Sequence, residues 1–74
     1  MRPSTWIKKN SDCPVLTAKA IDLFNRTLTQ YEQSNNSIRQ SYIRQLKDSL
    51  KNSDLYADYY VIAAKAFLKY IIKN

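Results

Sequence analysis

Glycine and histidine are absent from the 74-residue chain, and cysteine occurs once, at Cys13. One cysteine cannot form an internal disulfide, and without histidine the chain lacks the commonest zinc ligand. A glycine-rich phosphate-binding loop is also excluded. The six acidic residues are scattered along the sequence, so no arrangement for acid–base or nucleophilic catalysis can be identified. We therefore expect no catalytic site, no metal site and no enzymatic activity.

Helix breakers are almost as scarce, because proline occurs only at Pro3 and Pro14. From residue 15 onward only two polar clusters, 34–37 and 52–54, interrupt the chain, and their side chains are of the kind that cap helices. Hydrophobic residues make up 45% of the chain, which is too much for a disordered segment. The composition therefore predicts a folded, all-α protein.

Residues 1–13 are expected to form an extended N-terminal arm, since Pro3 resists helix formation. Trp6 and Ile7 supply one apolar anchor between basic residues. Trp6 could cover this domain's own core or contact another molecule, and the sequence leaves both open.

Asp12 and Pro14 mark the start of a first helix that ends near Glu32, because aspartate caps first-turn amides and proline is tolerated there. Apolar and small side chains recur along it at three- and four-residue steps, as expected for an amphipathic helix. These residues are Thr17, Ala20, Ile21, Phe24, Leu28 and Tyr31.

A second helix is predicted from Ile38 to Lys51 and a third from Leu55 onward. The third is apolar over more than half of its circumference, which requires burial on more than one side. Its charges at Asp58, Lys65 and Lys69 argue against a membrane span. Short breaks between the helices favour an antiparallel three-helix bundle over residues 14–74.

Twelve basic residues against six acidic ones give a formal charge of +6, which favours an acidic partner. The second helix concentrates part of this charge at Arg39, Arg44, Lys47 and Lys51, with Asp48 as its one acid. A cationic face can serve solubility alone, but its concentration on one helix favours partner binding.

Two short patterns resemble those of the LYR-motif (complex-one LYR) family of small mitochondrial proteins. In the first helix, Leu23 and Phe24 match the aliphatic and aromatic positions of the family triplet, although Asn25 stands at the basic position and Arg26 follows it. In the second helix, residues 39–52 carry spaced basic residues and end in Asn52, with Leu50 where the family has phenylalanine. The alanine-rich segment 62–68 is similar to the family's third helix.

The resemblance implies a non-enzymatic accessory subunit or assembly factor of a mitochondrial complex, most readily a respiratory one, in the matrix or on the matrix face of the inner membrane. Family members bind mitochondrial acyl carrier protein and accept its acyl-phosphopantetheine chain between their helices, with no cofactor of their own. The implied carrier-binding residues are Phe24, Arg26, Arg39, Arg44, Lys47 and Lys51. Those implied to line the acyl path, in addition to core packing, are Phe24, Ile43, Leu46, Leu50, Ala64 and Phe67.

Two other functions stay open at this point. A basic helical protein can bind nucleic acid, for example within a mitochondrial ribosome. However, the basic residues of the second helix are spaced around Leu46 and Leu50, without a dense basic run or a stacking platform. The chain could also be a purely structural subunit of a large complex that binds no carrier protein.

Overall fold

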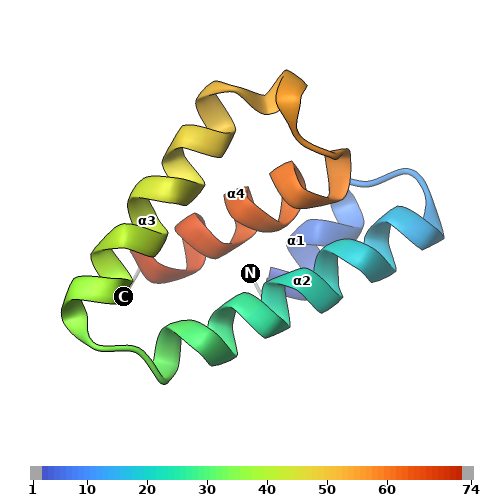
Figure 1. Cartoon of the computed structure of the whole chain (residues 1–74). Coiled ribbons are helices and arrows are strands. Elements are labelled where there is room, and N and C mark those ends of the chain that lie inside the picture. The colour runs from blue at the N-terminus through green and yellow to red at the C-terminus, as the bar shows by residue number, and fades with distance from the viewer. Residues whose placement is uncertain (1–2, 73–74) are drawn as a thin grey trace.

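The computed structural model describes the backbone of residues 3–72 and the side chains of residues 5–72. Residues 1–2 of the predicted arm and 73–74 of the predicted bundle lie outside the described residues. The described part contains helices and no strand, so the predicted all-α class is confirmed. The elements are α1 (Pro3–Lys9), α2 (Pro14–Glu32), α3 (Asn36–Lys51), the 3₁₀ turn η1 (Ser53–Leu55) and α4 (Asp58–Ile72) (Figure 1).

The N-terminal segment is helical, and the predicted extended arm is wrong for Pro3–Lys9. Pro3 lies at the first helical position, where its missing N–H removes no helical hydrogen bond. A helix of seven residues depends on packing, and Ile7 supplies it by lying fully buried in the core. Trp6 is half-buried against the same core, and Lys69 Nζ lies 5.7 Å from the centre of its ring.

Helix α2 has the bounds that the sequence predicts, but Asp12 does not occupy its N-cap position. Cys13 occupies the N-cap position with extended backbone, and no side chain caps the first-turn amides there. The Thr17 side chain and amide both donate to the Cys13 carbonyl, at 3.0 and 2.9 Å. Pro14 at the start of the helix was thus a sufficient signal without the predicted cap by Asp12.

The starts of the last two helices differ from the prediction by two or three residues. Asn35 caps α3 by accepting a 2.9 Å hydrogen bond from the Ile38 amide, so α3 begins at Asn36. The final helix begins at Asp58 and not at Leu55, because residues 53–55 close a 3₁₀ turn in which the Leu55 amide donates to the Asn52 carbonyl. Tyr56 then takes an extended conformation that interrupts the helical path.

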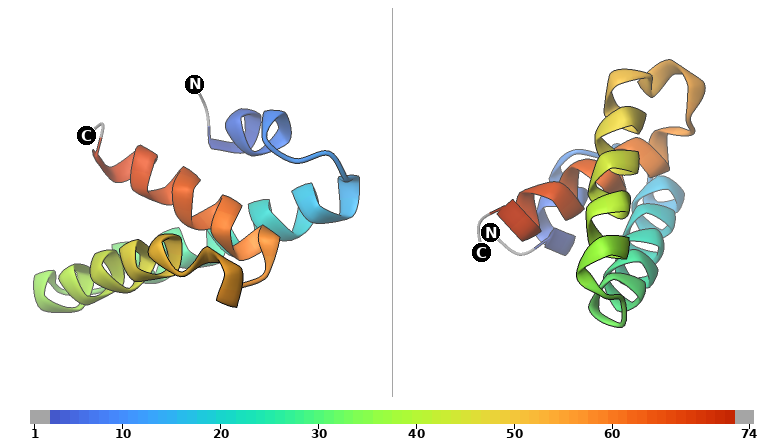
Figure 2. Two further views of the ribbon diagram at one scale, coloured as in Figure 1. Left: turned by 90° about the horizontal axis from the view of Figure 1, so that it is seen from above. Right: turned by 60° about the vertical axis from the view of Figure 1, so that its left-hand side comes forward.

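Helix α4 is the central element of the fold. It packs against α2, α3 and α1, whereas α2 and α3 diverge from their shared loop and contact each other over few residues (Figure 1). Seen from above, α4 lies between α1 and α3 (Figure 2). The described residues therefore form three longer helices, α2, α3 and α4, with α1 as a fourth (Figure 1). The core is formed by Ile7, Ala20, Phe24, Leu46, Ala63, Ala64, Ala66, Phe67 and Leu68.

Candidate functional site

Three cations on α3 form a continuous basic flank, which we define as Arg44, Lys47 and Lys51. All three are exposed, and none of them is paired with an acid within the described residues. Viewed down the axis of α3, half-buried Leu50 marks one edge of the basic flank. Lys47 lies about 60° round the axis from Leu50, Lys51 about 100° and Arg44 about 120°. Asp48, four residues after Arg44, follows about 40° beyond it on this side of the helix. The basic flank is therefore a group of three cations between Leu50 on one side and the single acid Asp48 on the other.

Arg39 lies on α3 as well, but it holds the fold together. Its Nε donates to the Tyr31 carbonyl at 2.9 Å and its Nη2 to the Glu32 carbonyl at 3.1 Å. Its guanidinium also lies 5.0 Å from the centre of the Tyr31 ring. The last carbonyls of a helix have no partner within the helix itself. The Tyr31 carbonyl also accepts from the Ser34 amide at 3.2 Å, and Arg39 adds a cap to α2 from the neighbouring helix.

The other two predicted partner-binding residues lie on α2, away from the basic flank. Arg26 is exposed and forms an ion pair with Asp22, one helical turn earlier. Phe24 is buried, and its ring makes edge contacts with Phe67 and Tyr70 at centroid distances of 5.9 Å. Of the six residues that the sequence suggests for partner binding, the three of the basic flank are thus exposed together.

Three of the predicted acyl-lining residues meet at one small void. Leu46, Ala64 and Phe67 line a space of about 10 Å³ between α2, α3 and α4, and Phe24 contacts Phe67 beside it. Ile43 is half-buried against the same core. Such a volume holds about one water at most, so an acyl chain does not fit unless the helices separate.

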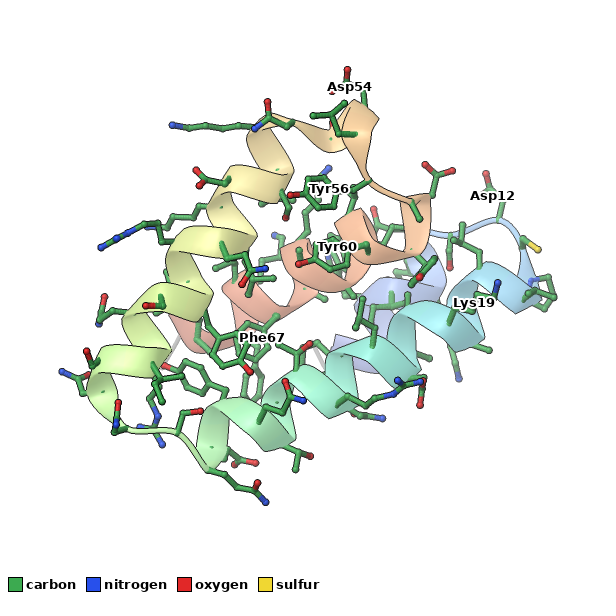
Figure 3. The ribbon with its side chains drawn as sticks, viewed as in Figure 1. Asp12, Lys19, Asp54, Tyr56, Tyr60 and Phe67 are labelled. Atoms are coloured by element: carbon green, nitrogen blue, oxygen red, sulfur yellow. The ribbon has the colours of Figure 1, made fainter. Side chains whose placement is uncertain are left out.

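Four further residues of this void were not identified from the sequence: Leu23, Thr27, Tyr60 and Ala63. Tyr60 lies beside the void and stacks on exposed Tyr56, with ring centres 5.1 Å apart (Figure 3). Partial burial, and then the neighbouring Tyr56, raise the pKa of Tyr60 above its ordinary value. Leu23 belongs to the triplet of the family resemblance, but whether its side chain faces the void depends on how α2 packs against the other helices.

Leu50, the remaining predicted acyl-lining residue, faces a different space. With Leu68 and Ile72 of α4 it lines an open groove of about 410 Å³, edged by Lys65 and Lys69. Sequence reasoning treated these two lysines only as interruptions of an apolar helix. Their three- and four-residue steps to Leu68 and Ile72 were the available signal that they share one face.

An acidic groove of about 550 Å³ lies near the N-terminal end of α4. Asp12, Asp54 and Asp58 line it, together with Val61 and Ile62. Among the described residues no three acidic or cysteine side chains are grouped so that they could hold a metal ion. This groove is therefore a region of negative charge.

Cys13 is exposed beside that groove, at the N-cap of α2. The backbone amides of Leu16 and then Val15 lower the pKa of its thiol, because they stabilise the thiolate. The chain offers no histidine to act as its base. Cys13 is therefore an exposed thiol of raised acidity.

Over the described residues, no helix combines the length and apolar character needed to cross a membrane. Comparison of the chain with protein-family models, with curated proteins and with solved structures finds no match.

Proposed function

We propose that the chain is a non-enzymatic, LYR-like accessory subunit or assembly factor of a mitochondrial complex, a respiratory complex first of all. In this proposal the basic flank docks the acidic acyl carrier protein, or an acidic neighbouring subunit. The observation that carries it is the grouping of Arg44, Lys47 and Lys51 on one side of α3, exposed and without acidic partners among the described residues. Unpaired cations of this kind attract and orient an acidic protein.

The position of α3 supports a second part of the proposal, the acceptance of an acyl chain. Helix α3 contacts α4 more extensively than α2. The side-chain hydrogen bonds that join it to α2 come from Arg39 and Tyr42, in its first half, so its second half, which carries Leu46, can move away from α2 while these bonds remain. Separation enlarges the void lined by Leu46, Ala64 and Phe67, and these apolar side chains suit an aliphatic chain. The chain's own residues supply only this lining, and the acyl-phosphopantetheine belongs to the partner.

The experiment is a calorimetric titration of the purified protein with mitochondrial acyl carrier protein in its unmodified, phosphopantetheine-bearing and acylated forms. We expect binding that weakens with added salt and is tightest for the acylated form. Arg44→Glu should weaken it about tenfold or more, with unchanged helicity by circular dichroism. The matched control is Lys9→Glu, which reverses an exposed charge on α1 and should leave the affinity unchanged.

Three outcomes would contradict the proposal, in whole or in part. Equal affinity of wild type and Arg44→Glu for the carrier would remove the role of the basic flank. Absence of carrier binding, together with salt-dependent binding of an RNA or DNA oligonucleotide, would favour a phosphate-binding function. Equal binding of acylated and unmodified carrier would be compatible with the docking surface but would contradict the acyl site.

A further inference from the structure

One side of α4 carries a stripe of residues that its own bundle covers only in part: Leu68 is buried, and Val61 and Ile62 are half-buried. The stripe consists of seven residues that share one face of α4, because they follow one another at steps of one to four. They are Asp58, Val61, Ile62, Lys65, Leu68, Lys69 and Ile72. Asp58, Lys65, Lys69 and Ile72 are exposed, with Ile72 at 73%. Helix α4 lies between α1 and α3 (Figure 2), and residues of the α4 stripe line both the acidic and the basic-edged grooves.

The sign of the charge reverses along the α4 stripe. At its N-terminal end Asp58 is joined by Asp12 and Asp54 around the acidic groove, and Figure 3 shows Asp12 and Asp54 at this end of the molecule. At its C-terminal end Lys65 and Lys69 edge the apolar groove. The helix dipole favours Asp58 and Lys69 at opposite ends of α4, but it does not account for two more aspartates arriving from other segments.

We propose that the α4 stripe is a self-association surface that binds a second copy of this chain, with the two α4 helices antiparallel about a two-fold axis. An antiparallel pair brings the aspartate end of each stripe against the lysine end of the other, so both ends are neutralised at once. A uniformly acidic partner would be repelled at the aspartate end, and a uniformly basic one at the lysine end. Self-complementary surfaces of this kind are what a two-fold dimer requires.

Apolar contacts fit the same register. When Asp58 opposes Lys69 of the second copy, Val61 and Ile62 oppose the aliphatic stem of its Lys65. Ile72, three residues after Lys69, is 73% exposed, and the same register places it beside the start of α4 in the second copy. Leu55 is 77% exposed but lies outside this register, because extended Tyr56 interrupts the helical path before Asp58.

The α4 stripe and the basic flank use different residues, so the proposal does not rest on carrier binding. Arg44, Lys47 and Lys51 belong to α3, and none of them is needed for the paired charges of the dimer. Failure of one proposal therefore leaves the other standing, and Arg44→Glu serves as the control variant here.

The experiment is sedimentation velocity on wild type, Asp58→Lys, Lys69→Asp and an equimolar mixture of the two variants, at low ionic strength over a range of concentrations. Wild type should be a dimer that added salt dissociates. Each single variant places like charges opposite each other twice and should lose about tenfold or more in dimer affinity. In the mixture, the lysine introduced in one chain meets the aspartate introduced in the other, so a heterodimer should form.

The mixture keeps the test decisive, because restored association excludes misfolding as the cause of the single-variant loss. Circular dichroism of each variant checks the helicity directly. Three results would overturn the proposal: wild type that stays monomeric up to its solubility limit, single variants that associate like wild type, or a mixture of folded variants that stays monomeric.

Discussion

Helices α3 and α4 have similar lengths, at 16 and 15 residues, but they have different positions in the molecule. Helix α4 contacts each of the other three α-helices and buries Ala63, Ala64, Ala66, Phe67 and Leu68. Helix α3 buries only Leu46 and Ser49 and carries the basic flank on its outer side. The difference indicates that α4 supplies most of the core, while α3 combines a modest packing role with a surface for partners.

The largest effect is expected from truncation at the centre of α4. Phe67 is 1% exposed and contacts both Phe24 and Tyr31, so Phe67→Ala should lower the free energy of unfolding by about 3–5 kcal/mol. Urea denaturation followed by circular dichroism measures it. Ile38→Ala on α3 removes a half-exposed side chain and should cost less than about 0.5 kcal/mol. Similar losses at both positions would mean that α4 is not the central element.

The next largest loss of stability is expected at Arg39, and it should distinguish this residue from Arg44 on the same helix. Arg39→Ala removes two hydrogen bonds to carbonyls at the end of α2 and a contact with the Tyr31 ring, and it should cost about 1–2 kcal/mol. Arg44→Ala removes an exposed cation and should leave the urea midpoint unchanged. If carrier binding is measured in parallel, we expect the reverse order: Arg44→Ala weakens binding and Arg39→Ala does so only through lost stability.

A smaller loss is expected at the start of α3. Asn35→Ala removes the side chain that accepts from the Ile38 amide and should cost about 1 kcal/mol. Asn36→Ala, one residue later and inside the helix, is the matched control and should be neutral or slightly stabilising. The urea midpoints of the two variants decide this, and equal midpoints would exclude the cap.

The smallest effect concerns chemistry at the start of α2. Because the amides of Leu16 and Val15 lower the pKa of Cys13, the thiolate persists to lower pH in the folded chain than in the unfolded one. The rate of alkylation by iodoacetamide should therefore rise at a lower pH in buffer than in concentrated urea. A midpoint at the same or higher pH in the folded protein would contradict this interpretation of the N-cap.

Much of the fold follows from local pattern. Pro14 and the apolar steps to Tyr31 predict α2. The polar cluster 34–37 predicts the break before α3, although α3 begins at Asn36, two residues before the predicted start. The predicted extended arm was wrong at Pro3, because a proline fits the first turn of a helix as well as an extended segment. It also misplaced the start of α4, since the 3₁₀ turn before it depends on how α3 ends.

The candidate site was predictable only in part, because the decisive contacts are between helices. The pattern identified Arg39 and Arg44 as equivalent cations on α3, yet Arg39 contacts α2 and Arg44 does not. The three aspartates around the acidic groove come from three separate segments. Nothing in their sequence spacing indicates that they meet at one end of α4.

Native purification tests the central claim, that the basic flank docks an acidic carrier, most directly. The tagged protein would be purified from mitochondria under mild conditions alongside an Arg44→Glu version, and intact masses of the bound proteins would be measured. We predict an acylated carrier protein with wild type and little or none with Arg44→Glu. Equal carrier recovery with both versions, or recovery of nucleic acid and ribosomal proteins without a carrier, would contradict the account.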